Sequence, residues 1–435
     1  MADDGRAIPA GGVEPPAGAV DGVRQDRTSD MDGDRHDRDA MTLDRHRRPW
    51  SPEPSRDRAP RRPGPGRAPD APAPLPVPGA LMLDPADLLA LFQPIGSLST
   101  GAVEGFETLA RLKVRDRLLP PSAFLPGLRG PASMTLLAEM LRQAGDMLAA
   151  LPPGHETCFV SVNVEASVLL MDAFMDVVLG FHTRHTGLGC GRLVLEIVES
   201  QAIQDTRRVR DRLTMLRALG TRVALDDLGS AYASLNNLRD LPADIIKLDH
   251  GFVSHLRERP RDLALILSLQ GLATNLGKRL VVEGVEERDV YDALRVLGVD
   301  LCQGFFIAEP MALDRLVSWL GEAALPRPAA PDSLLGAYAG HLRVTEACRV
   351  LTQQLLPIAW TEAARNPHAC TVGGFLDRRG LHDTEVGRAH KRFHEGLGLC
   401  HADRSAWQAG AEDFRLALEG AIAGHGAPRR SCDAV

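Results

Sequence analysis

The stretch RVALDDLGSAYASL, from Arg222 to Leu235, places two aspartates side by side where a short apolar run ends. The run Val223–Leu225 is typical of a buried strand, in which successive side chains point to opposite faces. Adjacent carboxylates also repel each other unless a positive group lies between them. We therefore expect Asp226 to end a strand, Asp227 to begin the following loop, and cations to lie close to both.

Similar apolar runs occur on both sides of this stretch and alternate with longer helical patterns. The runs are EGFETLARL, CFVSVNV, LVLEIVES, DIIKLD, RLVVEGVE and LCQGFFIAEP. The helical patterns RVRDRLTMLRALG and LALILSLQGLATNLG both end at a glycine suited to the position after a helix. Strands and helices that alternate in this way favour an α/β fold, a (β/α)8 barrel of the TIM type, over an open sheet.

Composition divides the chain into five parts. Residues 1–78 are rich in Pro, Arg and Asp and bury too little apolar surface to fold, so we expect a disordered tail. Residues 81–325 form the predicted barrel, and the proline-containing stretch 326–333 is a linker. Residues 334–424 are typical of a small all-α bundle, and 425–435 of a flexible C-terminus.

The overall composition is that of a globular protein. The net charge is −7, with 44% hydrophobic residues and seven cysteines without regular pairing. There is no basic block for general nucleic-acid binding, and no apolar run of membrane-spanning length. We expect a soluble, cytoplasmic protein that binds neither nucleic acid nor membrane.

Polar residues lie at or near the carboxyl ends of the apolar runs. In a barrel these ends form the mouth that carries the active site. A single such residue is as well explained by a strand end or a helix cap, but a set from several strands is not. The set comprises Glu107, Asn163, Glu196, Asp226, Lys247, Glu283 and Gln303.

The residue types in this set suit only a small range of metal ions and reactions. Oxygen ligands without His or Cys suit hard cations such as Mg²⁺ or Mn²⁺. Two such ions about 3.5–4 Å apart can activate water and stabilise both oxygens of an in-line phosphoryl displacement. The residues therefore predict a metal-dependent phosphoesterase, without naming its substrate.

Taken in order, the runs also spell a known pattern. GFETLARL resembles the signature of the EAL-domain cyclic di-GMP phosphodiesterases, and SVNV, LEIVES, LDDLGSAYASLNNLRDLPADIIKLD, VVEGVE and CQGFFIAEP follow in family order. The resemblance covers residues 88–322. It implies an EAL-type barrel that opens cyclic di-GMP to linear pGpG in bacterial second-messenger signalling.

The resemblance also implies roles for individual residues. One Mg²⁺ or Mn²⁺ ion would be held by Glu107, Asn163, Glu196 and Asp226. Asp226 would bridge to a second ion, which is held also by Asp227 and Glu283. Lys247 and Glu283 would position or deprotonate the attacking water, with Asp249 beside them. Arg111 would pair with a substrate phosphate, and the nucleotide pocket would be shaped by Gln93, Leu109, Glu286 and Gln303.

Four positions depart from the family pattern: Val198, Leu228, Ser230 and Ala231 stand where Thr, Phe, Thr and Gly are usual. The last three belong to the loop that the family uses for the second metal and for dimer contacts. They leave a second hypothesis open, a non-catalytic cyclic di-GMP receptor. Retention of every predicted metal ligand favours the enzyme.

The C-terminal part contains a separate set of metal-binding residues. His390 and His394 are four residues apart, so on a helix they share one face. With Cys370 and His341 they would complete a tetrahedral zinc site, although an amphipathic helix with solvated histidines explains the pair alone.

The order His, Cys, then His-x-x-x-His resembles the chemoreceptor zinc-binding (CZB) domain over residues 334–422. Val344 stands near the place where that family often has an aromatic residue. We do not expect the nearby residues Cys348, Cys400, His368, His382 and His401 to be zinc ligands. The resemblance implies regulation by zinc or redox state, and both families imply a homodimer.

Overall fold

The computed structural model describes residues 83–198, 206–228, 235–323, 325–327, 330–353, 366–398 and 404–426. Several predictions concern residues outside these ranges: the N-terminal tail, residues 427–435, Ser230, Ala231, Cys400, His401, and the side chains of Val198, Asp227 and Leu228. Among the helices that the structure describes, none has both the length and the apolar character needed to span a membrane.

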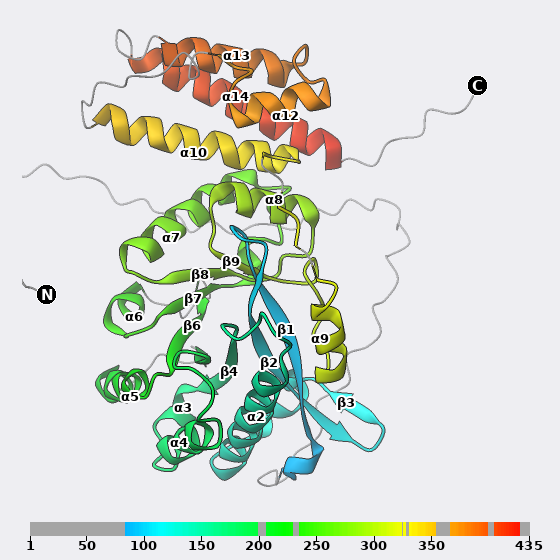
Figure 1. Ribbon diagram of the computed structural model, residues 1–435. Coiled ribbons are helices and arrows are strands. Elements are labelled where there is room, and N and C mark those ends of the chain that lie inside the picture. The colour runs from blue at the N-terminus through cyan, green and yellow to red at the C-terminus, as the bar shows by residue number, and fades with distance from the viewer. Residues whose placement is uncertain are drawn as a thin grey trace, which may run out of the picture. The chain divides into compact units, whose positions relative to one another are not determined.

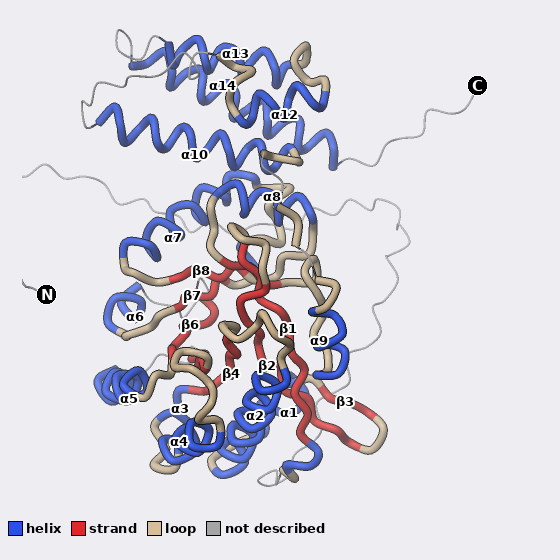
Figure 2. Tube along the Cα trace, viewed as in Figure 1, coloured by secondary structure: helices blue, strands red, loops and turns tan. Residues whose placement is uncertain are grey.

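Eight strands close into a ring (Figures 1 and 2). They are β1 (Leu88–Ser97), β2 (Val103–Val114), β4 (Phe159–Glu165), β5 (Leu193–Val198), β6 (Arg222–Leu228), β7 (Ile245–Leu248), β8 (Arg279–Val282) and β9 (Leu301–Gln303). Their order is β1-β9-β8-β7-β6-β5-β4-β2, and β2 pairs back with β1; the short β3 (Arg117–Leu119) extends β2. The closed barrel confirms the predicted fold class.

The first strand departs from a regular (β/α)8 barrel. β1 was not among the predicted strands, because its sequence LLALFQPIGS is rich in helix formers and contains Pro94, which is unusual inside a sheet. It runs antiparallel to both β2 and β9, and a short turn rather than a helix joins it to β2. The remaining strands of the ring are parallel to one another.

Helices surround the ring (Figure 2). They are α1 (Pro121–Phe124), α2 (Pro131–Ala150), α3 (Ala166–Leu169), α4 (Phe174–Arg184), α5 (Thr206–Ala218), α6 (Leu235–Asp240), α7 (Leu263–Asn275), α8 (Arg288–Leu297) and α9 (Leu313–Leu320). The glycines predicted to follow α5 and α7, Gly220 and Gly277, have φ values of +83° and +65°, the left-handed conformation expected after a helix.

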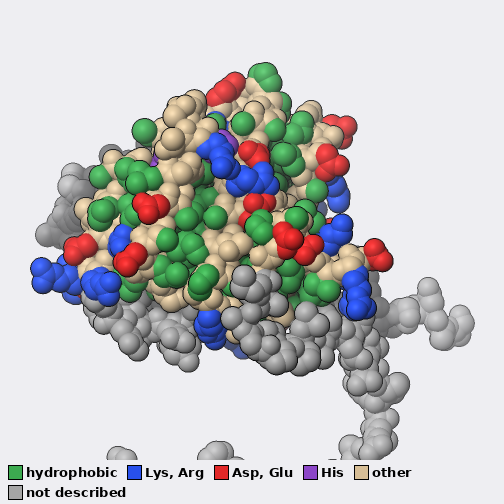
Figure 3. Space-filling view, turned by 90° about the horizontal axis from the view of Figure 1, so that it is seen from below, with side chains coloured by type: hydrophobic (Ala, Val, Ile, Leu, Met, Phe, Trp, Pro, Cys, Tyr) green, Lys and Arg blue, Asp and Glu red, His purple; other side chains and the backbone are tan. Residues whose placement is uncertain are grey.

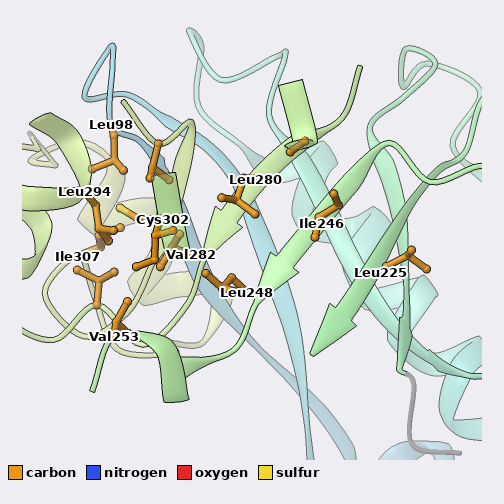
Figure 4. Close-up of a cluster of buried hydrophobic side chains, with 14 of the residues drawn as sticks. Leu98, Leu225, Ile246, Leu248, Val253, Leu280, Val282, Leu294, Cys302 and Ile307 are labelled. Atoms are coloured by element: carbon orange, nitrogen blue, oxygen red, sulfur yellow. The ribbon is translucent and has the colours of Figure 1, made fainter. Parts of the chain in front are cut away.

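Buried side chains alternate between two layers because successive residues of a strand point to opposite faces. One set lies between the strands and the helices, and Figure 4 shows part of it, including Leu225, Ile246, Leu280 and Val282. The other set fills the inside of the ring and consists of Ile95, Phe159, Val194, Ala224, Ile245, Val281 and Leu301. This interior plug supports the polar site described below.

A β-bulge lies at the two aspartates of β6. In the pairing with β7, Leu225 is opposite Ile246 but Leu228 is opposite Leu248, so β6 contains one extra residue. Asp227 therefore belongs to the strand and not to the following loop, which corrects the prediction. A bulge of this kind interrupts the strict alternation of side chains along a strand.

The C-terminal region is helical, as predicted. It comprises α10 (Leu334–Gln353), α12 (Thr371–Arg379), α13 (Glu385–Gly398) and α14 (Arg404–Gly426). α10 packs on α8, and α13 packs against α14. The buried carboxylate of Asp292 on α8 accepts hydrogen bonds from the backbone amides of Asp332 and Ser333 and from Ser333 Oγ, at 2.8–3.0 Å, just before α10 begins.

The molecular surface carries both signs of charge. On the face shown in Figure 3, lysine and arginine side chains are interspersed with acidic ones, and hydrophobic side chains lie between them. Many of the charges form exposed ion pairs within helices, such as Arg142 with Glu139 and Asp146 on α2.

Candidate functional site

A layer of polar side chains lies directly above the interior plug. On each parallel strand of the ring the polar residue comes two positions after the small or apolar residue that faces the inside, so both point inward. Glu196 thus follows Val194, Lys247 follows Ile245, and Glu283 follows Val281. On the antiparallel β1 the order is reversed, and Gln93 precedes Ile95. Pairing across the ladders brings Gln93 opposite Glu107 and Asn163 opposite Glu196.

Lys247 lies at the centre of this layer, with only 2% of its side chain exposed. Its Nζ lies 2.8 Å from Glu196 Oε2, 3.2 Å from Glu107 Oε2 and 2.5 Å from Glu283 Oε1. Asp226 Oδ1 is slightly farther away, at 3.7 Å. One ammonium group therefore joins carboxylates from four different strands or strand ends.

Amide side chains complete the surroundings of Glu107. Asn163 Nδ2 donates to Glu107 Oε1 over 2.8 Å, and Gln303 Nε2 donates to Oε2 over 2.7 Å. Gln303 Nε2 also lies 3.0 Å from Gln93 Oε1, and Gln93 Nε2 donates to the carbonyl of Ala308. The structure thus brings together Glu107, Asn163, Glu196, Asp226, Lys247, Glu283 and Gln303, the whole set predicted at the strand ends.

The electrostatics of the cluster follow from one cation among four carboxyl groups. Burial opposes the charge on Lys247, but the surrounding carboxylates outweigh it and hold the pKa of the ammonium well above its usual value. Burial likewise opposes ionisation of Glu107, yet the charge of Lys247 and the hydrogen bonds from Gln303 and Asn163 lower its pKa. For Glu283 burial prevails and raises the pKa to about 7, and the pKa of Glu196 is raised well above normal.

The residues fit a site for divalent cations. Four carboxyl groups lie around one ammonium, and the raised pKa values of Glu196 and Glu283 show that ionising all four is unfavourable without further cations. The donors are oxygens without sulfur or imidazole, the set preferred by Mg²⁺ and Mn²⁺. Glu283 Oε1 is buried and forms no hydrogen bond of ordinary geometry, so it has capacity for another partner.

The remaining predicted residues lie around this centre in different settings. Arg111 is half-buried near the end of β2, where burial lowers its pKa, and its Nη1 donates to the Ala110 carbonyl. Asp249 accepts a hydrogen bond from the amide of Gly251 and caps a short 3-10 helix. Leu109 is half-buried, and Glu286 is exposed in the loop that follows β8. The structure does not join these four side chains to the Lys247 cluster by any hydrogen bond or ion pair that it describes.

A comparison with family models identifies the barrel. The EAL domain model matches residues 82–310, which is more than half of the chain. The chain belongs to the EAL domain family. This match contains every residue of the Lys247 cluster and ends before the helical C-terminal region.

Two curated relatives match about half of the chain. A probable cyclic di-GMP phosphodiesterase of Escherichia coli is 30% identical, covering 53% of this chain and 46% of the relative. A cyclic di-GMP phosphodiesterase of Pseudomonas aeruginosa is 33% identical, covering 53% of this chain and 39% of the relative. The chain therefore spans less than half the length of these relatives.

Among solved structures, an EAL enzyme with cAMP and cyclic di-GMP bound superposes with a TM-score of 0.51. Its sequence identity is 22%, and the match covers 54% of this chain and 65% of that one. At this identity the similarity establishes the shared barrel fold.

A second group of metal-binding side chains lies in the helical region. Cys370, His390 and His394 place one ligand atom each within 4.8 Å of the others. Cys370 Sγ and His394 Nε2 both lie 3.2 Å from His390 Nε2, and both histidines are buried. Cys370 also caps α12 by accepting a hydrogen bond from the amide of Gly373. The predicted i, i+4 histidine pair therefore faces the protein interior rather than solvent.

His341 has a different environment. It is buried beside the rings of Phe393 and Phe414, and its Nε2 lies 2.9 Å from the carbonyl of Ala411. Its Nδ1 is buried without a hydrogen-bond partner. Among the described residues, the compact ligand group contains three of the four predicted zinc ligands and does not include His341.

The structure also brings together three residues outside the predicted zinc set, namely His368, Asp377 and His382. Their spacing of nine and five positions matches neither a helix nor a strand, so periodicity gives no signal for them. Only the turn of the chain around α12 makes them neighbours.

Proposed function

We propose that this protein hydrolyses cyclic di-GMP to linear pGpG with the help of divalent metal ions. The observation that carries the proposal is the buried Lys247, surrounded by Glu107, Glu196, Asp226 and Glu283 inside an EAL barrel. The two relatives named as cyclic di-GMP phosphodiesterases support the choice of substrate.

Glu107, Asn163, Glu196, Asp226, Asp227 and Glu283 would hold two Mg²⁺ or Mn²⁺ ions. When bound, such ions lower the pKa of water and stabilise negative charge on phosphoryl oxygens. The chain's own residues orient the reactants. Lys247, whose pKa is held well above its usual value, would stay protonated and fix the carboxylates around it, and Glu283 would take a proton from the attacking water.

In this hydrolysis the water oxygen forms a new bond to phosphorus, and the bond from phosphorus to one ribose 3′-oxygen breaks. The leaving 3′-oxygen gains a proton, and the water loses one. Arg111, which lies near the end of β2, would pair with a phosphate of the dinucleotide. Gln93, Leu109, Glu286 and Gln303 would shape the nucleotide pocket, and Asp249 would order the segment after Lys247.

The test is turnover by the purified full-length chain with cyclic di-GMP and Mg²⁺ or Mn²⁺, followed by separation of pGpG. We expect turnover that stops in chelator and in Glu107→Gln, with a control such as Glu322→Gln, outside the site, unchanged. Robust binding without turnover under all metal conditions would instead support the receptor hypothesis, for which Leu228, Ser230 and Ala231 are the sequence argument.

We also propose that residues 334–424 form a zinc-binding domain that regulates the barrel. The clustering of Cys370, His390 and His394 supports zinc, since their donors suit it and His390 Nε2 lies 3.2 Å from both of the other ligand atoms. His341, through Nδ1, remains the proposed fourth ligand. Zinc content should fall in Cys370→Ser, whereas equal content and affinity would exclude this ligand. The control is the same measurement in Cys348→Ser, because Cys348 is a buried cysteine on α10 outside the proposed ligand set.

A further inference from the structure

His368, Asp377 and His382 form a compact, partly exposed cluster at one end of the helical region. Their ligand atoms all lie within 4.8 Å of one another. His368 Nδ1 is 3.2 Å from Asp377 Oδ1, and His382 Nε2 also contacts Asp377 Oδ1. The two imidazole rings lie 4.5 Å apart between centroids. Two imidazoles thus converge on a single carboxylate oxygen from opposite ends of α12.

The backbone around α12 holds these side chains in place. His368 precedes the helix, Asp377 lies in its last turn, and His382 follows it. Gly380, with φ of +65°, ends the helix in a left-handed conformation that turns the chain back toward its start. The positions of the two histidines therefore depend on the helix itself and not on a long loop.

Two glycines allow the backbone next to the cluster to approach a helix closely. A Cβ at Gly373 would lie 1.7 Å from the Pro367 carbonyl oxygen and 3.2 Å from His368 Cα. A Cβ at Gly387 would lie within 2.5 Å of the backbone of His382. The backbone of His368 and His382 is packed directly against a helix, so the positions of their Cα atoms are fixed.

We propose that His368, Asp377 and His382 bind a second zinc ion, with water completing its coordination. Two imidazole nitrogens and one carboxylate oxygen are a common donor set for Zn²⁺ sites that keep an open position. In a tetrahedron with zinc–nitrogen bonds of about 2.0–2.1 Å, neighbouring ligand atoms lie about 3.3 Å apart. The distance of 3.2 Å between His368 Nδ1 and Asp377 Oδ1 is close to this spacing, whereas His382 Nε2 lies nearer to the same oxygen, so binding an ion requires the His382 ring to move back.

This site is distinct from the Cys370, His390 and His394 cluster, because the two groups share no ligand. They are nevertheless adjacent, since His368 and Cys370 are separated by a single residue. The exposed site lacks a thiolate and is open to water, so its ion exchanges faster than an ion at the buried cluster. The second site does not depend on whether the buried cluster holds zinc.

The experiment is a Zn²⁺ and Co²⁺ titration of the full-length chain in excess Mg²⁺, which competes for the oxygen ligands of the barrel. Asp377→Asn and His368→Gln, a variant of the most exposed ligand, are each compared with Asp383→Asn, which alters an exposed acid next to the cluster. We expect Asp377→Asn and His368→Gln to lose one bound ion per chain or to weaken its binding at least about tenfold. Asp383→Asn should bind as the wild type does.

Cobalt separates the two sites by spectroscopy. Only an ion at Cys370 gives a thiolate-to-cobalt charge-transfer band, so this band should persist in Asp377→Asn and His368→Gln. Cys370→Ser should lose the band but keep the ion at the exposed site. Unchanged stoichiometry and affinity in both cluster variants would overturn the proposal, as would a parallel loss of the thiolate band, since a single shared site would then explain the data. Circular dichroism of each variant establishes that it is folded.

Discussion

Lys247 donates a hydrogen bond to Glu196 Oε2 over 2.8 Å, and each of these side chains is only 2% exposed. An ammonium on β7 and a carboxyl group on β5, with β6 between them, therefore lie in the barrel interior, where removal of either partner is costly. The same ammonium also faces Glu107 and Glu283. The cluster is thus an electrostatic unit in which the loss of one member affects all.

Replacing Lys247 with Met should therefore destabilise the chain in chelator. The substitution keeps the length of the side chain but leaves four carboxyl groups without their cation, and breaking a buried pair typically costs about 3–5 kcal/mol. Thermal unfolding in chelator measures the loss. Lys278→Met is the matched control, because Lys278 is half-buried and donates a hydrogen bond to the Ala243 carbonyl, outside the cluster. Equal destabilisation by both variants would contradict the central role of Lys247.

Added Mn²⁺ should stabilise the wild-type chain against heat. A ligand at a hundredfold excess over its Kd stabilises the folded state by about 2.7 kcal/mol, provided that it does not bind the unfolded chain. Glu196→Gln removes one of the proposed ligands, so the shift in Tm on adding Mn²⁺ should shrink. Glu139→Gln, on the outer helix α2, should retain the full shift. A Tm that does not respond to Mn²⁺ or Mg²⁺ in the wild type would exclude a metal site of useful affinity.

Gly304, directly after Gln303, should not tolerate a side chain. A Cβ there would lie 2.2 Å from the carbonyl oxygen of Val285 and 2.3 Å from its nitrogen, and backbone atoms cannot move aside cheaply. We expect Gly304→Ala to destabilise by roughly 1–3 kcal/mol, as overpacking does. Gly271 on α7 offers the opposite case, because a Cβ there meets nothing within 4 Å. Gly271→Ala should stabilise the helix by about 0.5–1 kcal/mol. Urea unfolding of the two variants measures the free energy of unfolding, which should fall in Gly304→Ala and rise in Gly271→Ala.

Asp292 should anchor the start of α10 to α8. Its Oδ2 accepts three hydrogen bonds from residues 332 and 333, and Oδ1 accepts one from Arg295. Asp292→Ala leaves the half-buried amides of Asp332 and Ser333 without this acceptor, at a cost of up to about 1–3 kcal/mol for each group left unsatisfied. Hydrogen exchange should then rise at the first turn of α10. Asp289→Ala, which removes an exposed ion pair with Arg257, should change stability by less than about 1 kcal/mol. Unchanged protection in Asp292→Ala would show that α10 is held by apolar packing alone.

Much of the barrel could be predicted because its strands are short, apolar and separated by helices of recognisable period. The polar set could be predicted too, since Glu196, Lys247 and Glu283 each follow an inward-facing apolar residue by two positions. Residue types and spacing were therefore sufficient for the centre of the site. β1 was missed because LLALFQPIGS lacks alternation, begins with the helix formers Leu and Ala, and contains Pro94.

Other features depend on tertiary geometry that no local pattern reveals. The bulge at Asp226 and Asp227 appears only in the register between β6 and β7. His341 is surrounded by Phe393, Phe414 and the Ala411 carbonyl. These groups lie on α13 and α14, far from His341 in the sequence. Likewise, the meeting of His368 with His382 requires the complete turn around α12.

The apolar plug inside the ring determines how substrate can enter the site and how product can leave it. Ile95, Phe159, Val194, Ala224, Ile245, Val281 and Leu301 occupy the barrel interior below the polar layer. Gly105 makes room for the Phe159 ring, whose atoms lie 2.5–2.6 Å from where a Cβ would stand. The barrel is therefore closed at the amino-terminal ends of its parallel strands and open only at their carboxyl ends. Whatever enters toward Lys247 must leave by the same route, so a departing product and an arriving substrate exclude each other.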